Sequence, residues 1–186
     1  MEKNIMIVGV GGQGTLLTSR ILGGIGDNDV KLSEVHGMAQ RGGSVVTFVR
    51  YGENVREPIV EEGQADVLIA FERLEAMRYI NFLKADGVLI LNDIRIDPIT
   101  VLTGVDKYPE NIVEKLKKNH KVVAFDAMKI ANDLGNARVF NLIVLGVCAQ
   151  FMECSKEKWL EVIEKTVPAK TIEINKKAFL TGLNLK

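Results

Sequence analysis

Short apolar runs alternate with amphipathic stretches along almost the whole chain. Residues 4–8 and 65–71 are continuous apolar runs, which are typical of strands covered on both faces of a sheet. Residues 156–166 repeat apolar positions at helical spacing, whereas 139–152 are apolar nearly all round and predict a deeply buried helix. The strands predicted in this way are 4–8, 30–35, 44–50, 65–71, 87–92 and 121–125. The helices are 15–22, 72–83, 110–119, 126–134, 139–152, 156–166 and 175–183.

This order of elements predicts an α/β protein. Repeated strand–helix alternation indicates a Rossmann-like three-layer fold, with a mostly parallel sheet and helices on both faces. The strands 30–35 and 44–50 are joined too closely for a crossover, so they should be antiparallel and the sheet mixed. In 94–105, Asp97-Pro98 suggests a turn before a short strand. Gly146 in the apolar helix would admit another backbone. We expect one domain over residues 1–186.

Composition narrows the function classes. Lys plus Arg equals Asp plus Glu at 24 each, so the formal net charge is zero and nucleic acid is not an expected partner. The chain starts directly in a strand and has no apolar run long enough to span a bilayer, which favours a cytoplasmic protein without a membrane partner. Its two cysteines, Cys148 and Cys154, are too few for a cluster or zinc ligand set, so we expect free thiols and no metal.

A glycine-rich turn follows the first predicted strand. Gly9, Gly11 and Gly14 fit the G-x-G-x-x-G pattern, and Glu34 lies about twenty residues further on, as in dinucleotide-binding folds. Backbone amides in such a turn can receive a phosphate. The candidate binding residues here are Gly9, Gly11, Gly12, Gln13, Gly14, Thr15 and Glu34. The alternative is that the glycines only let the helix pack tightly on the strand.

A second glycine-rich loop, 36–43, should lie beside the first at the carboxyl edge of the sheet. Its candidate binding residues are Gln40, Arg41, Gly42 and Gly43. Arginine has a planar cationic fork that suits phosphate or carboxylate, although a salt bridge or a partner contact explains Arg41 equally well. His36 is better explained as a loop anchor than as an acid–base group.

The sequence offers no catalytic residue. Glu72 and Glu75 are most simply the solvated start of a helix. We find no arrangement of nucleophile, base and orienting group along the chain.

Several motifs together resemble the gamma-type domain of 2-oxoacid:ferredoxin oxidoreductases. They include the first glycine loop, the second loop with its flanks at 33–45, and segments at 65–70, 135–146 and 175–182, so that the resemblance covers essentially the whole chain. The His-Gly-Met-Ala-Gln-Arg-Gly-Gly form of the second loop is most similar to the branch acting on indolepyruvate. One departure is the segment 23–30, which looks a few residues short and should shorten the end of the first helix.

The resemblance implies a reaction carried out by an assembly. A 2-oxoacid, here an aryl pyruvate such as indolepyruvate, is decarboxylated on thiamine diphosphate, iron–sulfur clusters pass electrons to ferredoxin, and coenzyme A takes the acyl group. Thiamine diphosphate and the clusters would belong to a larger alpha subunit. This chain, inactive alone, would complete the active-site wall and contact the coenzyme A phosphates through 11–14, Gln40 and Arg41.

Three alternatives stay open at this point. The chain could be the gamma subunit of a pyruvate or 2-oxoglutarate enzyme, a stand-alone NAD-dependent enzyme with Glu34 on the ribose, or a non-catalytic assembly module. The identity of the oxoacid, the subunit stoichiometry and direct contact with coenzyme A are likewise open.

Overall fold

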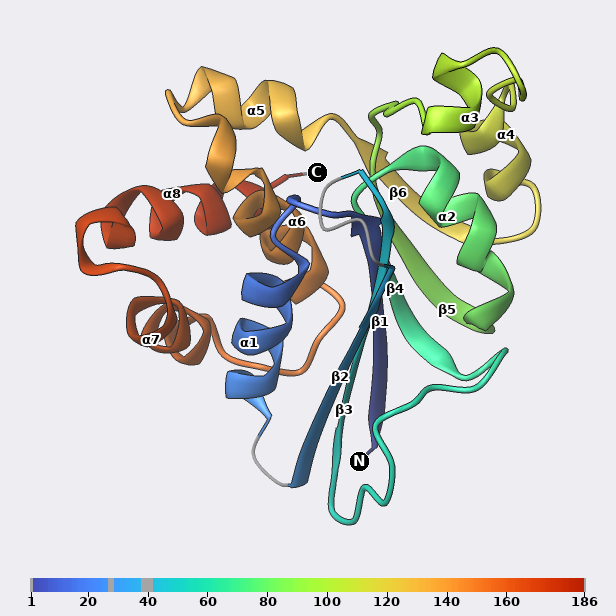
Figure 1. The fold of residues 1–186 in the computed structure, drawn as a ribbon. Helices are drawn as coiled ribbons and strands as arrows, with labels where there is room; N and C mark the ends of the chain where they lie inside the picture. Colours follow the sequence, from blue (N-terminus) through green and yellow to red (C-terminus); the bar gives the residue numbers. More distant parts are fainter. Residues whose placement is uncertain (1, 27–28, 38–41, 186) are drawn as a thin grey trace.

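The computed structural model describes residues 2–26, 29–37 and 42–185, and it has three layers (Figure 1). One six-stranded sheet in the order β2-β3-β1-β4-β5-β6 separates two sets of helices. The strands β1, β4, β5 and β6 are parallel, whereas β3 runs antiparallel to both of its neighbours, β1 and β2. The predicted mixed, mostly parallel sheet with helices on both faces is confirmed. That residues 1–186 form one domain stays a prediction.

The strands are β1 (Lys3–Val10), β2 (Asp29–His36), β3 (Ser44–Gly52), β4 (Ala65–Ala70), β5 (Leu83–Asn92) and β6 (Lys121–Phe125). The α-helices are α1 (Thr15–Ile25), α2 (Arg73–Tyr79), α3 (Ile99–Leu102), α4 (Ile112–Lys117), α5 (Ala127–Asp133), α6 (Phe140–Ala149), α7 (Lys156–Thr166) and α8 (Ile172–Leu183). Short 3₁₀ turns span Ile80–Phe82, Ala137–Val139 and Ala169–Thr171. No described helix combines the length and apolar character that crossing a membrane requires.

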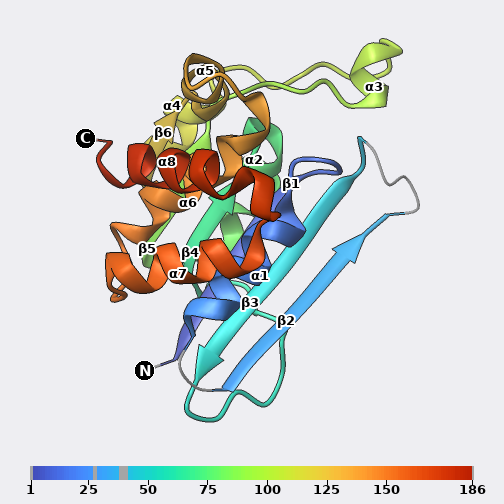
Figure 2. The same cartoon turned by 90° about the vertical axis from the view of Figure 1, so that its left-hand side faces the viewer.

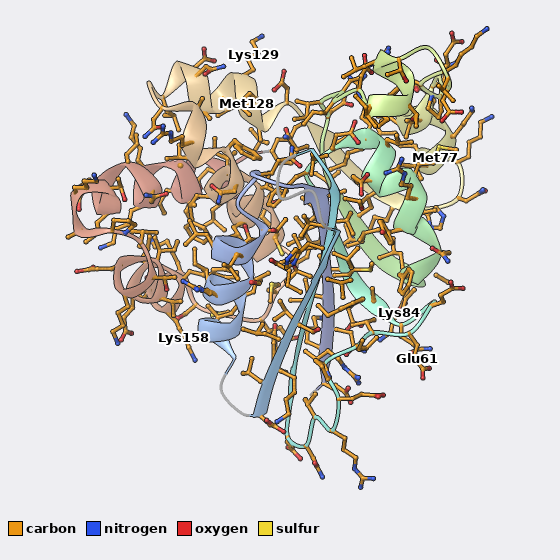
Figure 3. The ribbon with its side chains drawn as sticks, in the orientation of Figure 1. Glu61, Met77, Lys84, Met128, Lys129 and Lys158 are labelled. Carbon is orange, nitrogen blue, oxygen red and sulfur yellow. The ribbon has the colours of Figure 1, made fainter. Side chains whose placement is uncertain are left out.

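Each face of the sheet has its own hydrophobic core. On one face α1, α5, α6, α7 and α8 pack against side chains such as Ile7 and Ile69. On the other face α2 and α4 cover Met6 and Leu68, the neighbouring residues in the same strands. Figure 3 shows side chains filling the space between the sheet and the helices, while Lys129 on α5 points away from the sheet. Because β1 and β4 are buried on both faces, they read as continuous apolar runs.

Several elements differ from the predicted ones; besides those described next, α6 ends three residues earlier, at Ala149, and α8 begins three residues earlier, at Ile172. The first helix continues to Ile25 instead of ending at residue 22, because its glycines pack against neighbours: a Cβ on Gly24 would lie 2.6 Å from Val162 on α7. The helix predicted over 72–83 ends at Tyr79, and β5 already begins at Leu83. The short strand expected within 94–105 is instead α3, at the tip of an arm that stands away from the body (Figure 2). The local sequence pattern predicts whether most elements are helices or strands, but tertiary packing determines where each element ends.

The buried helix α6 and the terminal helix α8 touch through their backbones. A Cβ on Gly146 would lie 2.1 Å from the carbonyl oxygen of Phe179, and one on Gly182 would lie 2.0 Å from that of Ile143. All ten residues of α6 are buried. The predictions of deep burial for this helix and of close backbone approach at Gly146 are therefore confirmed.

This contact gives a stability prediction. Gly146→Ala should lower the free energy of unfolding by about 3 kcal/mol or more, because the new methyl group meets backbone that cannot rotate away. Urea unfolding followed by circular dichroism measures the change. Gly37→Ala is the matched control, since nothing lies within 4 Å of the added Cβ. Equal stability of the two variants would contradict the proposed tight contact.

Candidate functional site

The candidate site lies where β1 and β4 end. These neighbouring parallel strands are followed by helices on opposite faces, α1 in one core and α2 in the other. In open α/β sheets ligands bind outside the carboxyl ends of the strands at such a switch point. Figure 2 shows the loop after β1 and the end of β2 at this same end of the sheet.

The first glycine loop exposes backbone amides. Gly14 is the N-cap of α1 with φ 85°, a conformation that favours glycine, and it has no side chain to cap the helix. Within the described part of the chain, no acceptor meets the amides of Gly12, Gly14, Thr15 and Leu16. These donors and the helix dipole together favour an anionic group at this place.

Gln13 holds the loop to the sheet. Its Oε1 accepts a hydrogen bond from the amide of Val10 at 2.7 Å, and its Nε2 donates to the carbonyl of Phe71 at 3.1 Å. The side chain therefore ties the end of β1 to the end of β4. Gly9 leaves room for it, because a Cβ there would lie 2.8 Å from Oε1. Gly9 and Gln13 therefore position the loop from its buried side.

Glu34 occupies a different place from the acid of a dinucleotide-binding fold. Because β3 lies between β1 and β2, the acid is two strand spacings, about 10 Å, from β1. Its Oε2 accepts hydrogen bonds from the hydroxyls of Thr47 at 3.1 Å and Thr15 at 3.4 Å. Glu34 thus forms the far wall of the site and is linked to the start of α1 through Thr15.

The second loop meets the first. The amide of Gly11 donates to the carbonyl of Gly43 at 2.9 Å, so the described end of the second loop lies beside the first loop, as predicted. Gly42 has φ 79°. Gln40 and Arg41 lie outside the described residues, so their binding role stays a prediction.

An open cleft of about 430 Å³ lies over these loops. It is lined by Gly11, Gly12, Gly14, Thr15, Leu16, Glu34, His36 and Val45. The His36 side chain is 54% exposed, with Nδ1 3.9 Å from Oε1 of Glu34. The cleft therefore combines free amides on one side with a carboxylate and an imidazole on the other.

Glu72 is buried, contrary to its expected solvation. It is only 1% exposed. One carboxylate oxygen caps α2 by accepting from the amides of Leu74 and Glu75, and the other accepts from the amide of Ile96 and the hydroxyl of Tyr108. This carboxylate therefore fixes both sides of the arm that carries α3.

Glu75 is also buried, at 3% exposed, and the expectation of a solvated helix start is wrong here too. It accepts hydrogen bonds from the hydroxyl of Ser44, the first residue of β3, and from Arg78 at 2.6 Å. Burial raises the pKa of Glu75, and the bonds from Ser44 and Arg78 oppose the rise. One feature of the sequence indicates that both acids are buried. They follow directly after a strand that is buried on both faces, so the helix that carries them must begin inside the molecule.

The two cysteines are poor metal ligands in this fold. Both are free, and burial raises the pKa of the Cys148 thiol to about 12. Burial also raises the pKa of Cys154. Within the described ranges, no three His, Cys, Asp or Glu side chains are grouped so that they could hold a metal ion.

Known proteins share this fold and sequence pattern. The chain is 42% identical to indolepyruvate oxidoreductase subunit IorB of Thermococcus kodakarensis, over 98% of this chain and 95% of that protein. It is 29% identical to 2-oxoglutarate synthase subunit KorC of Methanothermobacter marburgensis, over 100% and 97%. The solved keto/oxoacid ferredoxin oxidoreductase gamma subunit of Geobacter sulfurreducens has a TM-score of 0.70 at 27% identity, covering 97% of this chain and 95% of that one.

The three-layer fold with its cleft at the carboxyl edge thus defines a small subunit of the gamma type. Residues 4–185 match the pyruvate ferredoxin/flavodoxin oxidoreductase family, and the chain belongs to that family. It is a subunit of a 2-oxoacid:ferredoxin oxidoreductase. The predicted family and its oxidoreductase class are confirmed.

The buried Glu75 carboxyl gives a pH prediction. Because its pKa is raised in the folded protein, the folded state binds the proton more tightly than the unfolded state. The wild type should therefore gain stability relative to Glu75→Gln as the pH falls from neutral towards 4.5, the ordinary value. Urea unfolding of both proteins across this range measures the difference. A wild type that loses stability relative to Glu75→Gln on acidification would contradict the raised pKa.

Proposed function

We propose that this chain is the non-thiamine, non-cluster subunit of an oxidoreductase that converts indolepyruvate, or a related aryl pyruvate, to an acyl-coenzyme A. The observation that carries the substrate class is the 42% identity to an indolepyruvate oxidoreductase subunit, against 29% to a 2-oxoglutarate synthase subunit, each over nearly the full length. The pyruvate and 2-oxoglutarate alternatives are less well supported for the same reason.

The partner is a larger alpha subunit that holds thiamine diphosphate and the iron–sulfur clusters and passes electrons to ferredoxin. The chemistry of this chain supports that division, because its thiols have raised pKa values and lack neighbouring ligands among the described residues. The carboxyl-edge cleft would then form part of the shared active-site wall. We place the assembly in the cytoplasm, without a nucleic-acid or membrane partner.

The contribution of this chain to chemistry is binding and orientation. We propose that the amides of Gly12, Gly14 and Thr15 hold phosphate groups of coenzyme A, with Gln40 and Arg41 reaching them from the second loop. The support is the set of unpaired amides at the N-terminus of α1 and the contact between the loops at Gly11 and Gly43. Held there, the cofactor would keep its thiol directed towards the partner subunit, where the acyl group forms.

The stand-alone NAD-dependent reading is disfavoured by the place of Glu34. In a dinucleotide-binding fold the acid ends the strand beside β1 and meets the ribose. Here β3 takes that position, and Oε2 of Glu34 already accepts from Thr15 and Thr47.

The assembly predicts that activity depends on both subunits. The purified chain should be inactive with indolepyruvate, coenzyme A and ferredoxin, and activity should appear when the alpha subunit is added. The rate of ferredoxin reduction measures it, with pyruvate and 2-oxoglutarate as comparison substrates. Turnover by the isolated chain would refute the subunit assignment, and a preference for 2-oxoglutarate would refute the substrate class.

Calorimetric titration separates coenzyme A from NAD. We expect saturable binding of coenzyme A and none of NAD. Glu34→Ala should leave coenzyme A affinity unchanged or improve it, because removing a negative charge from the cleft wall weakens repulsion of phosphate. An NAD-binding site predicts the reverse, namely NAD binding that is lost in Glu34→Ala.

A further inference from the structure

Asn141, in the first turn of α6, is an unusual polar residue in this core. It is 3% exposed in a helix whose other residues are almost all apolar. Its neighbour Phe140 packs edge-on against Phe71, with ring centroids 5.5 Å apart, so the start of α6 is fixed against the end of β4. A buried amide normally has partners for both its oxygen and its nitrogen.

Only one end of this amide is satisfied. Oδ1 accepts from the amide of Leu142 at 3.1 Å, so Nδ2 is the free end, and it has no acceptor among the described residues. The described side-chain polar atoms that are both fully buried and unpaired are Nδ1 of His120 and Nε1 of Trp159. Nδ2 of Asn141 is unpaired as well, but unlike those two atoms it is not fully buried, so part of it is accessible to solvent.

The free nitrogen points to the first glycine loop. A Cβ on Gly14 would lie 2.6 Å from Nδ2 of Asn141, so only glycine fits at this N-cap. The neighbouring amides of Gly12, Thr15 and Leu16 are unpaired within the described residues. An asparagine side-chain donor therefore lies beside Gly14, at the start of α1, where several backbone donors are unpaired in the described chain.

We propose that Asn141 and the N-terminus of α1 form one anion site, in which Nδ2 of Asn141 donates a hydrogen bond to a phosphate group of the ligand. The fixed Oδ1 contact leaves the amide nitrogen oriented before the ligand arrives, so little side-chain entropy is lost on binding. The assignment of this phosphate to coenzyme A rests on the proposed function, whereas the anion site itself is inferred from the structure alone.

Glu34 limits where an anion can bind. Its carboxylate repels anions, and its Oε2 already accepts hydrogen bonds from Thr15 and Thr47. The phosphate is therefore expected beside Gly14 and Asn141, away from Glu34.

The test uses inorganic pyrophosphate as the probe and the full-length chain, with affinity measured by calorimetry. Asn141→Ala removes the donor and should weaken binding about tenfold. Asn141→Asp replaces the donor with a negative acceptor of the same shape and should weaken binding about a hundredfold. Asn136→Asp is the matched control: it adds the same charge just before α6, at an Asn whose oxygen already accepts from the amide of Arg138. This control should change affinity less than twofold.

Thermal unfolding accompanies each titration. A carboxylate near the N-terminus of a helix favours the helix dipole, so both Asp variants should stay folded while their affinities differ. Equal weakening by Asn141→Asp and Asn136→Asp would show a general charge effect and overturn the proposal. No effect of Asn141→Ala, or no pyrophosphate binding by the wild type, would overturn it as well.

The same variants separate the anion site from its assignment to coenzyme A. In the reconstituted enzyme, Asn141→Ala should raise KM for coenzyme A several-fold with little change in kcat or in KM for the oxoacid. Loss of pyrophosphate binding with an unchanged KM for coenzyme A would confirm the anion site and refute the proposed coenzyme A contact.

Discussion

The carbonyl of Phe71, at the end of β4, is the point on which the candidate site depends. Two buried side-chain amides donate to it, Gln13 at 3.1 Å and Asn92 at 3.2 Å. Gln13 also accepts from the amide of Val10, and Asn92 accepts from the amide of Ala127. Three parallel strands and the start of α5 are thereby joined at the carboxyl edge, where each unpaired buried group would otherwise cost about 1–3 kcal/mol.

This network fixes the glycine loop without occupying its amides. Because the Gln13 side chain turns inward, the backbone around Gly14 faces out with its donors unpaired in the described chain. Phe71 also holds the start of α6 through its contact with Phe140, and so it places Asn141 beside Gly14. The glycine loop, the anion donors and the core are therefore in contact through Phe71, and a change in packing at Phe71 would displace all three.

The opposite face of the sheet contributes through two buried acids. Glu75 bonds to Ser44 at the start of β3, directly after Gly43, which in turn pairs with Gly11. Glu72 holds the arm that carries α3. Burying these carboxylates is costly, and the raised pKa of Glu75 reflects that cost. Glu75 is thus linked through Ser44 to the contact between the two glycine loops, whereas the partners of Glu72 flank α3.

The α/β class, most strands and helices, the family and the contact between the two glycine loops could be predicted from the amino-acid sequence. These follow from local pattern: the doubly apolar runs of β1 and β4, the glycines before α1, and the short connection that forces β2 and β3 to be antiparallel. The folded structure was needed to show that β3 separates Glu34 from β1, that Glu72 and Glu75 are buried, and that Asn141 lies beside Gly14. Strand order and contacts between helices distant in sequence depend on how whole faces pack, and no window of neighbouring residues contains that information.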